Sequence, residues 1–161
     1  MIMNSVTINT KFGIIELTEN NQKLISLKLL SDKNPLTFDL KKANLKNQTN
    51  EFLLSVERQL NEYFSKKRKV FDLDLNPKGT EFQQKAWQIL SKINYAETIS
   101  YEEQAILIGN KNSKRAVGQA NSKNPIPIII PCHRVVRKNK ALGGYAGGID
   151  MKKLLLELES K

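Results

Sequence analysis

Apolar and polar residues alternate in three short runs over the first thirty positions of the chain. The runs are SVTINT (5–10), GIIELT (13–18) and LISLKLL (24–30), and the KFG and ENNQK segments between them are typical of turns. We predict a meander of antiparallel strands over this part of the chain. The polar stretch at 32–50 is predicted to be a loop.

A helical period replaces this alternation from residue 50 onward. In NEFLLSVERQLNEYFSKK (50–67), apolar residues recur every three or four positions, which predicts one helix with a buried face. That face consists of Phe52, Val56, Leu60, Tyr63 and Phe64. The segment 67–79 has room for one short strand and ends in a Pro/Gly break, so we place the domain boundary between residues 76 and 77.

The second half of the chain is predicted to be mainly helical. Thr80 is placed to cap a helix in GTEFQQKAWQILSKI (79–93). Its apolar face consists of Phe82, Ala86, Ile89, Leu90 and Ile93. Another helix is predicted from Ser100, because Ser100 and Glu103 have the spacing of a capping box and Gly109 is placed to end the helix.

Two further helices complete this half. After the short turn NKNS (110–113), the segment SKRAVGQANSKN (113–124) is predicted to be helical and to stop before Pro125. The segment IDMKKLLLELES (149–160) is predicted to bury Met151, Leu154, Leu155 and Leu158 on one face.

Two short helices joined by a tight turn, the second of them basic, match the layout of a helix-turn-helix. The same pattern fits an ordinary helix pair in an all-α subdomain. The second helix contains Ala116, Gly118 and Ala120, and an interior glycine costs about 1 kcal/mol relative to alanine. These small side chains allow close approach, either of a nucleic-acid backbone or of another helix.

Net charge strengthens the nucleic-acid interpretation. The formal net charge is +10, and a strongly basic surface favours a polyanionic partner, although it also serves solubility. Residues 1–75 carry 12 basic and 9 acidic side chains, whereas residues 76–161 carry 14 and 7. Between residues 111 and 140 there are eight basic residues and no acidic one. This asymmetry indicates an anion-binding face.

Composition also excludes several classes of protein. One cysteine rules out an intrachain disulfide framework, and one cysteine with one histidine is too few for a structural zinc site. We see no secretory signal pattern and no apolar run of about 20 residues. We therefore expect a cytoplasmic protein without a metal or cofactor and without membrane association.

The cysteine and the histidine stand side by side in NPIPIIIPCHRVVRKNK (124–140). The apolar run before Cys132 is predicted to be a buried strand. A lone cysteine is commonly a core residue, but Arg134 and Arg137 follow within five positions, and positive charge stabilises the nucleophilic thiolate. His133 is a candidate base. Neighbours in a strand point to opposite faces, so either the chain turns here or a water joins the two groups.

A third group should orient the imidazole, and Asp150, Glu157 and Glu159 are all candidates by position. The segment GGYAGG (143–148) then reads either as a flexible turn or as a loop whose backbone amides approach a ligand, with Tyr145 packed on it.

The motif IPCHRVV resembles the active-site signature of the O6-alkylguanine-DNA alkyltransferases, also called methylated-DNA–protein-cysteine methyltransferases. ISYEEQA, RAVGQANSKNPIPIIIPCHRVV, GGYAGG and LLLELE occur in the family's order between about residues 82 and 159. The resemblance implies an α+β fold, with an RNase H-like domain of antiparallel strands plus helix at 1–76. It implies a mostly helical, winged helix-turn-helix-like DNA-binding domain at 77–161.

The resemblance also assigns roles in a direct-reversal repair reaction. Cys132 would accept the alkyl group of O6-alkylguanine irreversibly and once per molecule, His133 would act on it through a water, and Glu159 would orient His133. Asn124 would hold the active-site turn, and Tyr101 would donate a proton to guanine N3. The carbonyls of Cys132 and Val135 would accept from the guanine amine. Gly143, Tyr145 and Ala146 would form the loop facing O6.

For the DNA, the resemblance implies minor-groove binding with the target nucleotide flipped out. Arg115 would fill the gap left in the duplex. The remaining DNA contacts would come from Lys114, Ala116, Gly118, Ala120 and Asn121. Some relatives carry serine at Ala146, and some bind zinc in the N-terminal domain, for which this chain lacks ligands.

The implied partner is double-stranded DNA containing O6-alkylguanine, bound by a monomer; whether O4-methylthymine is also repaired stays open.

Two other functions compete with this DNA repair reaction. A non-catalytic lesion binder would have replaced the cysteine, which is present here. A thiol hydrolase or acyltransferase would need an oxyanion hole and leaves the basic helix pair unexplained.

Overall fold

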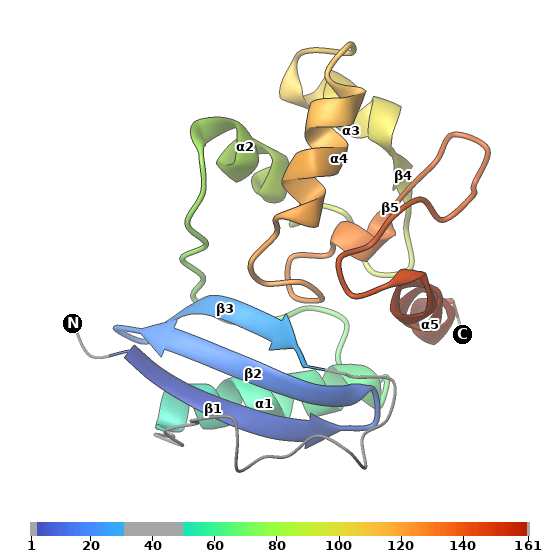
Figure 1. The fold of residues 1–161 in the computed structure, drawn as a ribbon. Coiled ribbons are helices and arrows are strands. Elements are labelled where there is room, and N and C mark those ends of the chain that lie inside the picture. The colour runs from blue at the N-terminus through green and yellow to red at the C-terminus, as the bar shows by residue number, and fades with distance from the viewer. Residues whose placement is uncertain (1–2, 31–49, 161) are drawn as a thin grey trace. The chain divides into compact units, whose positions relative to one another are not determined.

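The structure, a computed structural model, describes residues 3–30 and 50–160 of the chain. It divides into two compact units, Met1–Pro77 and Lys78–Lys161, each described by itself below (Figure 1). The boundary predicted from the sequence lies one residue earlier. Most of the polar stretch predicted to be a loop, residues 32–49, falls outside the described residues.

The first unit contains the predicted antiparallel meander. Strands β1 (Met3–Thr10), β2 (Gly13–Asn20) and β3 (Lys23–Leu29) pair in the order β1-β2-β3, with Ile8 opposite Ile15 and Leu17 opposite Leu27. In β2, alternate residues from Ile15 to Glu19 are buried, as a sheet with one covered face requires. The three-stranded sheet is therefore confirmed.

Helix α1 (Glu51–Phe64) covers one face of this sheet (Figure 1). Asn50 caps it by accepting from the Leu53 amide at 2.9 Å, and its side-chain amide donates to Glu19 on β2 at 2.9 Å. Four of the five predicted face residues are buried, and Phe52 is half-buried. Leu53 is also buried, so the apolar face is wider than the prediction.

The short strand expected between residues 67 and 79 is reduced to a single bridge. Leu75 bridges Leu24, and the Leu24 amide donates to the Asp74 carbonyl at 2.8 Å. The buried Gln59 side chain occupies both backbone groups of Asp72, accepting from its amide at 2.8 Å and donating to its carbonyl at 2.9 Å. Backbone groups that are hydrogen-bonded to a side chain cannot also pair with a neighbouring strand, so strand pairing does not include Asp72.

Local sequence signals explain the helices of the second unit. Helix α2 (Glu81–Leu90) begins with a capping box between Thr80 and Gln83, and α3 (Tyr101–Ile108) with one between Ser100 and Glu103. Gly109 ends α3 at φ 98°, a left-handed conformation that favours glycine. After the turn comes α4 (Lys114–Ser122), so the predicted pair of short helices is present.

Buried polar side chains tie these three helices together. Gln104 on α3 and Asn121 on α4 exchange amide hydrogen bonds of 3.0 and 2.7 Å, and Gln104 also donates to the Ala86 carbonyl of α2 at 3.2 Å. The Trp87 indole of α2 donates to the Ala120 carbonyl of α4 at 2.9 Å. Because each bond is buried, its loss would leave unpaired polar groups, and the helices keep a fixed arrangement.

The remaining elements pack against α2, α3 and one another. Strands β4 (Ile99–Ser100) and β5 (Val135–Val136) form a two-residue parallel pair, and the 3₁₀ helix η1 (Cys132–Arg134) precedes β5 directly. Helix α5 (Ile149–Glu159) packs against η1. None of the helices in the described ranges 3–30 and 50–160 is long and apolar enough to cross a membrane.

Two predictions about this unit are wrong. Leu154 is 46% exposed, because the buried apolar face of α5 consists of Met151, Leu155 and Leu158 and does not include Leu154. The apolar run at 126–131 is buried as expected, but it is a turn rather than a strand, with a bridge between Pro127 and Ile130 and a positive φ of 75° at Ile128.

Candidate active site

Cys132 lies at the start of η1, where the buried turn at 126–131 ends. The turn is held by Asn124, whose side-chain amide donates to the Ile130 carbonyl at 2.8 Å and whose oxygen accepts from the Ile126 amide at 3.0 Å. The same Asn124 nitrogen lies 3.2 Å from the Cys132 sulfur. Asn124 therefore fixes the turn and the thiol together.

The Cys132 thiol is nearly inaccessible, with 5% of the residue exposed. Burial raises its pKa from 9.0 to about 11, while the hydrogen bond from Asn124 and the charge of Lys152 act in the opposite direction. The resting group is thus a neutral thiol at pH 7, and a base has to remove its proton before it can act as a nucleophile.

His133 is fully buried and lies next to a carboxylate. Its Nε2 is 2.9 Å from Glu159 Oε1, and burial lowers the pKa of the imidazole below its usual value of 6.5. A neutral imidazole that donates from Nε2 leaves Nδ1 as its acceptor. Nδ1 is buried and has no hydrogen-bond partner within the described protein. His133 is consequently oriented as a base.

Glu159 is itself held by Arg134. The guanidinium donates to both carboxylate oxygens, at 2.8 Å from Nη2 and 3.0 Å from Nε, and to the Ile93 carbonyl at 2.6 Å from Nη1. Of the three acids that the sequence left open by position, Glu159 is the one in contact with His133.

Because η1 is a tight 3₁₀ turn, Cys132 and His133 need not point to opposite faces as they would in a strand.

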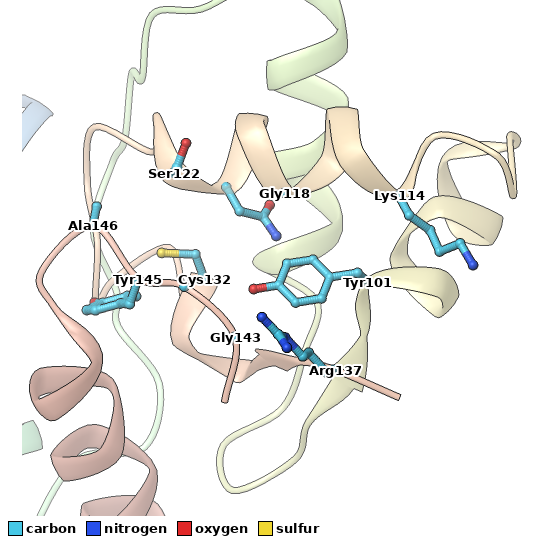
Figure 2. Close-up of a pocket in the computed structure, with 11 residues that line it drawn as sticks. Tyr101, Lys114, Gly118, Ser122, Cys132, Arg137, Gly143, Tyr145 and Ala146 are labelled. Carbon is cyan, nitrogen blue, oxygen red and sulfur yellow. The ribbon is translucent and has the colours of Figure 1, made fainter. Parts of the chain in front are cut away.

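A cavity of about 430 Å³ opens beside the cysteine. In Figure 2, the Cys132 sulfur and the Tyr101 hydroxyl face the same cavity, below α4 and beside the segment with Tyr145 and Ala146. The cavity is lined by Tyr101, Lys114, Gly118, Asn121, Ser122, Cys132, Arg137, Gly143, Gly144, Tyr145 and Ala146. Its volume is in the range of small-molecule sites.

Tyr101 and Gly143 form one wall of the cavity. Burial raises the pKa of Tyr101 above 10.0, so its hydroxyl keeps its proton at pH 7 and can donate it. Gly143 has a φ of 70°, and a Cβ at that position would lie 2.8 Å from the Tyr101 hydroxyl oxygen. Glycine is required there both by backbone conformation and by the closeness of Tyr101.

The predicted DNA-contacting residues of α4 fall into two groups. Lys114, Arg115 and Ala116 are exposed at the start of the helix, and Gly118 lies over the Tyr101 ring at the cavity. Ala120 is only 2% exposed because it packs inside the helical unit, so it does not belong to the predicted contact surface.

Asn121 lines the cavity, but its amide is engaged with Gln104 as described above. Lys114 forms an ion pair of 3.4 Å with Glu102, which also pairs with Lys138 at 3.0 Å.

The source of positive charge near the thiol differs from the prediction. Arg134 and Arg137 were the candidates, but Arg134 is committed to Glu159, and the cation that lowers the Cys132 pKa is Lys152 of α5. Lys152 was not among the residues predicted from the sequence. A usable signal exists, because Lys152 is seven residues before Glu159 and shares the buried face of α5.

The site therefore combines a buried thiol, a histidine oriented by a carboxylate, a phenol that can donate its proton, and a cavity next to the basic helix α4. In the described part of the chain, no cluster of three or more His, Cys, Asp or Glu side chains is arranged to hold a metal ion. The arrangement suits nucleophilic substitution at a small carbon centre by a deprotonated cysteine.

Comparisons with known proteins agree with this chemistry. Residues 3–77 match the family model described as "6-O-methylguanine DNA methyltransferase, ribonuclease-like domain", and residues 81–161 match the one described as "6-O-methylguanine DNA methyltransferase, DNA binding domain". The ribonuclease-like domain and the helical DNA-binding domain expected from the sequence are thus confirmed.

Two curated relatives illustrate the similarity. The constitutive methylated-DNA–protein-cysteine methyltransferase of Bacillus subtilis is 41% identical over 154 residues, which are 95% of this chain and 93% of that protein. The methylated-DNA–protein-cysteine methyltransferase of Methanosarcina acetivorans is 51% identical over 112 residues, which are 70% of this chain and 72% of that one.

Solved structures extend the similarity to the fold. The crystal structure of the O6-methylguanine methyltransferase of Mycobacterium tuberculosis has a TM-score of 0.85 and 39% identity, covering 99% of this chain and 93% of that one. A structure of the Mycobacterium tuberculosis protein in complex with DNA has a TM-score of 0.86, covering 98% and 92%.

Proposed function

This chain belongs to the 6-O-methylguanine DNA methyltransferase family, and from that premise we propose that Cys132 accepts the alkyl group of O6-alkylguanine in double-stranded DNA. The protein is a methylated-DNA–protein-cysteine methyltransferase, a DNA repair protein that binds DNA. The observation that carries the assignment to Cys132 is its position, at the wall of the cavity and beside the His133–Glu159 pair.

The reaction begins with loss of the thiol proton. His133, neutral and donating to Glu159 from Nε2, takes the Cys132 proton on Nδ1, directly or through one water. The charge that develops on the imidazole faces the Glu159 carboxylate, which stabilises it. Arg134 keeps that carboxylate in place from the opposite side.

The thiolate then attacks the alkyl carbon on O6. A carbon–sulfur bond forms as the carbon–oxygen bond breaks, and the electron pair of the broken bond passes to the guanine. Tyr101 donates its proton to guanine N3, which makes guanine a better leaving group. The product is a thioether on Cys132. A thioether has no easy leaving path, so each protein molecule acts once.

Guanine is positioned by backbone groups around the cavity. The carbonyls of Cys132 and Val135 accept from the exocyclic amine, and the amides near Tyr145 and Ala146 face O6. Gly143 allows this segment to approach Tyr101 closely. Alanine at position 146 leaves the backbone amide available but provides no hydroxyl.

The base reaches the cavity only after it leaves the duplex. Extruding a nucleotide costs a few kcal/mol, and a side chain inserted from the minor groove offsets part of that cost. We assign this insertion to Arg115, which is exposed on α4, with Lys114, Ala116 and Gly118 along the same approach. The minor groove gives little sequence readout, which suits a search for lesions.

Two further parts of the proposal concern the setting of the reaction. Transfer within one protein molecule needs a single Cys132 and no second subunit, so we assign the activity to a monomer. A thiol nucleophile must stay reduced, which agrees with a cytoplasmic location.

Stoichiometry tests the proposed function. A duplex carrying one labelled O6-methylguanine should transfer at most one methyl group per protein, and Cys132→Ala should bind the duplex with unchanged affinity and accept none. Tight binding without transfer by the natural protein would instead identify a lesion binder. Repeated turnover on thioesters or peptides would identify a hydrolase.

A further inference from the structure

Arg137 lies at the wall of the cavity, but it has no part in the reaction described so far. Its backbone is held in a tight turn, because its amide donates to the Ala141 carbonyl and its carbonyl accepts from the Lys140 amide, both at 2.8 Å. The side chain is exposed and lines the cavity. Among the described residues 3–30 and 50–160, no carboxylate lies within ion-pair distance of its guanidinium. The charge of Arg137 is therefore available to a group at that wall.

The pairing of β4 with β5 places Arg137 beside Tyr101. The two strands are parallel, and their last residues lie opposite each other. The next residue of each segment is Tyr101, which begins α3, and Arg137, which begins the turn. One position further, Glu102 and Lys138 form an ion pair of 3.0 Å, so the two segments stay adjacent beyond the strands. Backbone pairing thus fixes which cation stands next to the phenol.

The guanidinium of Arg137 faces the hydroxyl end of Tyr101. Figure 2 shows the Arg137 nitrogens next to that end of the ring, and both side chains line the same cavity. Burial and then the Cys132 sulfur raise the pKa of Tyr101 above 10.0, and the charge of Arg137 acts in the opposite direction. The cation therefore favours the ionised phenol that the buried site otherwise disfavours.

Two other cations near Tyr101 differ from Arg137. Lys114 lines the same cavity but forms an ion pair of 3.4 Å with Glu102. Lys152 lies 5.8 Å from the centre of the ring and donates to two backbone carbonyls. Of these three cations, Arg137 is the one whose side chain has no hydrogen bond or ion pair within the described residues.

We propose that Arg137 is a positioning residue of methyl transfer, which stabilises the phenolate that forms on Tyr101 when its proton passes to guanine N3. The inference rests on the proposed function, in which Tyr101 is the proton donor. The O–H bond of Tyr101 breaks, an N–H bond forms at N3, and the electron pair stays on the phenolate oxygen.

The movement of charge explains why a cation is useful at this place. Guanine leaves as a neutral molecule, so the negative charge that began on the Cys132 sulfur ends on the Tyr101 oxygen, beside Arg137. The proton that His133 took from the thiol balances this charge overall. A fixed charge that faces the place where the opposite charge develops lowers the barrier without reorganisation.

A substrate that cannot accept the proton separates this role from DNA binding. In a duplex carrying O6-methyl-3-deazaguanine, carbon replaces N3, so Tyr101 has no acceptor there. We would measure the single-turnover rate of methyl transfer at saturating duplex, for this substrate and for O6-methylguanine. The proteins compared are the natural one, Arg137→Met, Arg137→Lys and the control Lys138→Met, which removes an equal charge from a neighbouring side chain that is 85% exposed.

The expected pattern differs between the two substrates. Loss of a nearby charge shifts a pKa by on the order of one unit, and a half-transferred proton carries about half of that effect, so Arg137→Met should slow transfer from O6-methylguanine about threefold. Its rate with the deaza substrate should equal that of the natural protein. Arg137→Lys should retain most of the rate, because it keeps the charge, and Lys138→Met should react like the natural protein.

Two results would overturn the role at Tyr101. Equal slowing with both substrates would identify Arg137 as a phosphate contact, and the slope of log affinity against log salt would then also fall by about one. Slower alkylation of Cys132 by iodoacetamide in Arg137→Met would show that the substitution disturbs the thiol instead. That reaction reports on the thiol alone, because Cys132 is the sole cysteine and the reagent needs no proton from Tyr101.

The pKa of Tyr101 provides a second test, which needs no DNA. The four tyrosines would be replaced by a fluorinated tyrosine, whose lower phenol pKa brings the titration toward neutral pH, and the Tyr101 resonance would be assigned with Tyr101→Phe. Arg137→Met should raise the pKa of Tyr101 by on the order of one unit, and Lys138→Met should leave it unchanged. An equal pKa in the natural protein and Arg137→Met would overturn the proposal.

The two assays also separate this inference from the proposed function. Failure of the natural protein to transfer methyl would reject the proposed function alone, because the fluorine titration still reports whether Arg137 acts on Tyr101. Methyl transfer by the natural protein, with an unchanged O6-methylguanine rate in Arg137→Met, would reject the inference alone.

Discussion

Replacing Glu159 with glutamine separates the charge of this buried carboxylate from its shape. His133, Arg134 and the Ala96 amide all donate hydrogen bonds to it, at distances between 2.8 and 3.3 Å. A glutamine must turn its NH₂ group toward at least one of these donors. It also leaves Arg134, whose side chain is 7% exposed, without a counter-charge.

The expected cost follows from this geometry. Breaking a buried ion pair by removing one partner costs about 3–5 kcal/mol, because the remaining charge stays buried. The control is Glu157→Gln on the same helix, since the Glu157 side chain is 52% exposed and its ion pair with Lys153 measures 3.9 Å. An exposed pair of this kind contributes about 0–1 kcal/mol.

Urea unfolding followed by fluorescence provides the assay. Trp87 is the single tryptophan and is buried in α2, so its emission reports on the second unit specifically. Glu159→Gln should lower the free energy of unfolding by about 3–5 kcal/mol and Glu157→Gln by less than about 1 kcal/mol. Equal effects of the two variants would refute the view that Glu159 is a buried counter-ion.

Three other variants test individual contacts. Arg115→Ala should slow repair in a duplex more than reaction with the free base, and equal losses would contradict its insertion into DNA. Asn124→Ala should cost about 2–4 kcal/mol in urea unfolding, because it leaves buried backbone groups unpaired, and should slow iodoacetamide alkylation of Cys132. Gly143→Ala should slow methyl transfer, since its Cβ would collide with the Tyr101 hydroxyl; an unchanged rate would refute that contact.

Helix ends were predictable because their determinants are local. The Thr80 and Ser100 caps and the Gly109 terminus depend on residues within one turn, and all three are confirmed. The strand meander was equally local, since short turns separate runs of alternating polarity. These signals located the start of α2, both ends of α3 and the three strands.

The run before Cys132 shows what apolarity alone does not determine. PIIIP predicts burial, and burial is confirmed, but a short apolar run has no period that distinguishes a strand from a turn. Asn124 decides the outcome by binding Ile126 and Ile130. Its two bonds are visible only in the folded chain.

Charge near the thiol was predicted from adjacency, and adjacency was misleading. Arg134 follows Cys132 by two positions, yet it points to Glu159, twenty-five positions further along the chain. Lys152 reaches the site from another helix, and a buried lysine contradicts the usual preference for exposure. Closeness in the sequence therefore predicted the wrong cation beside the thiol, although the sequence did identify Cys132 as the candidate nucleophile.

The most direct test of the account is to locate the transferred group. We would incubate the protein with a duplex containing O6-methylguanine, digest it, and map the product by mass spectrometry. The account predicts a single methyl group on the peptide containing Cys132, in an amount that never exceeds the protein. A methyl group on another residue, or full repair with an unmodified Cys132, would contradict it.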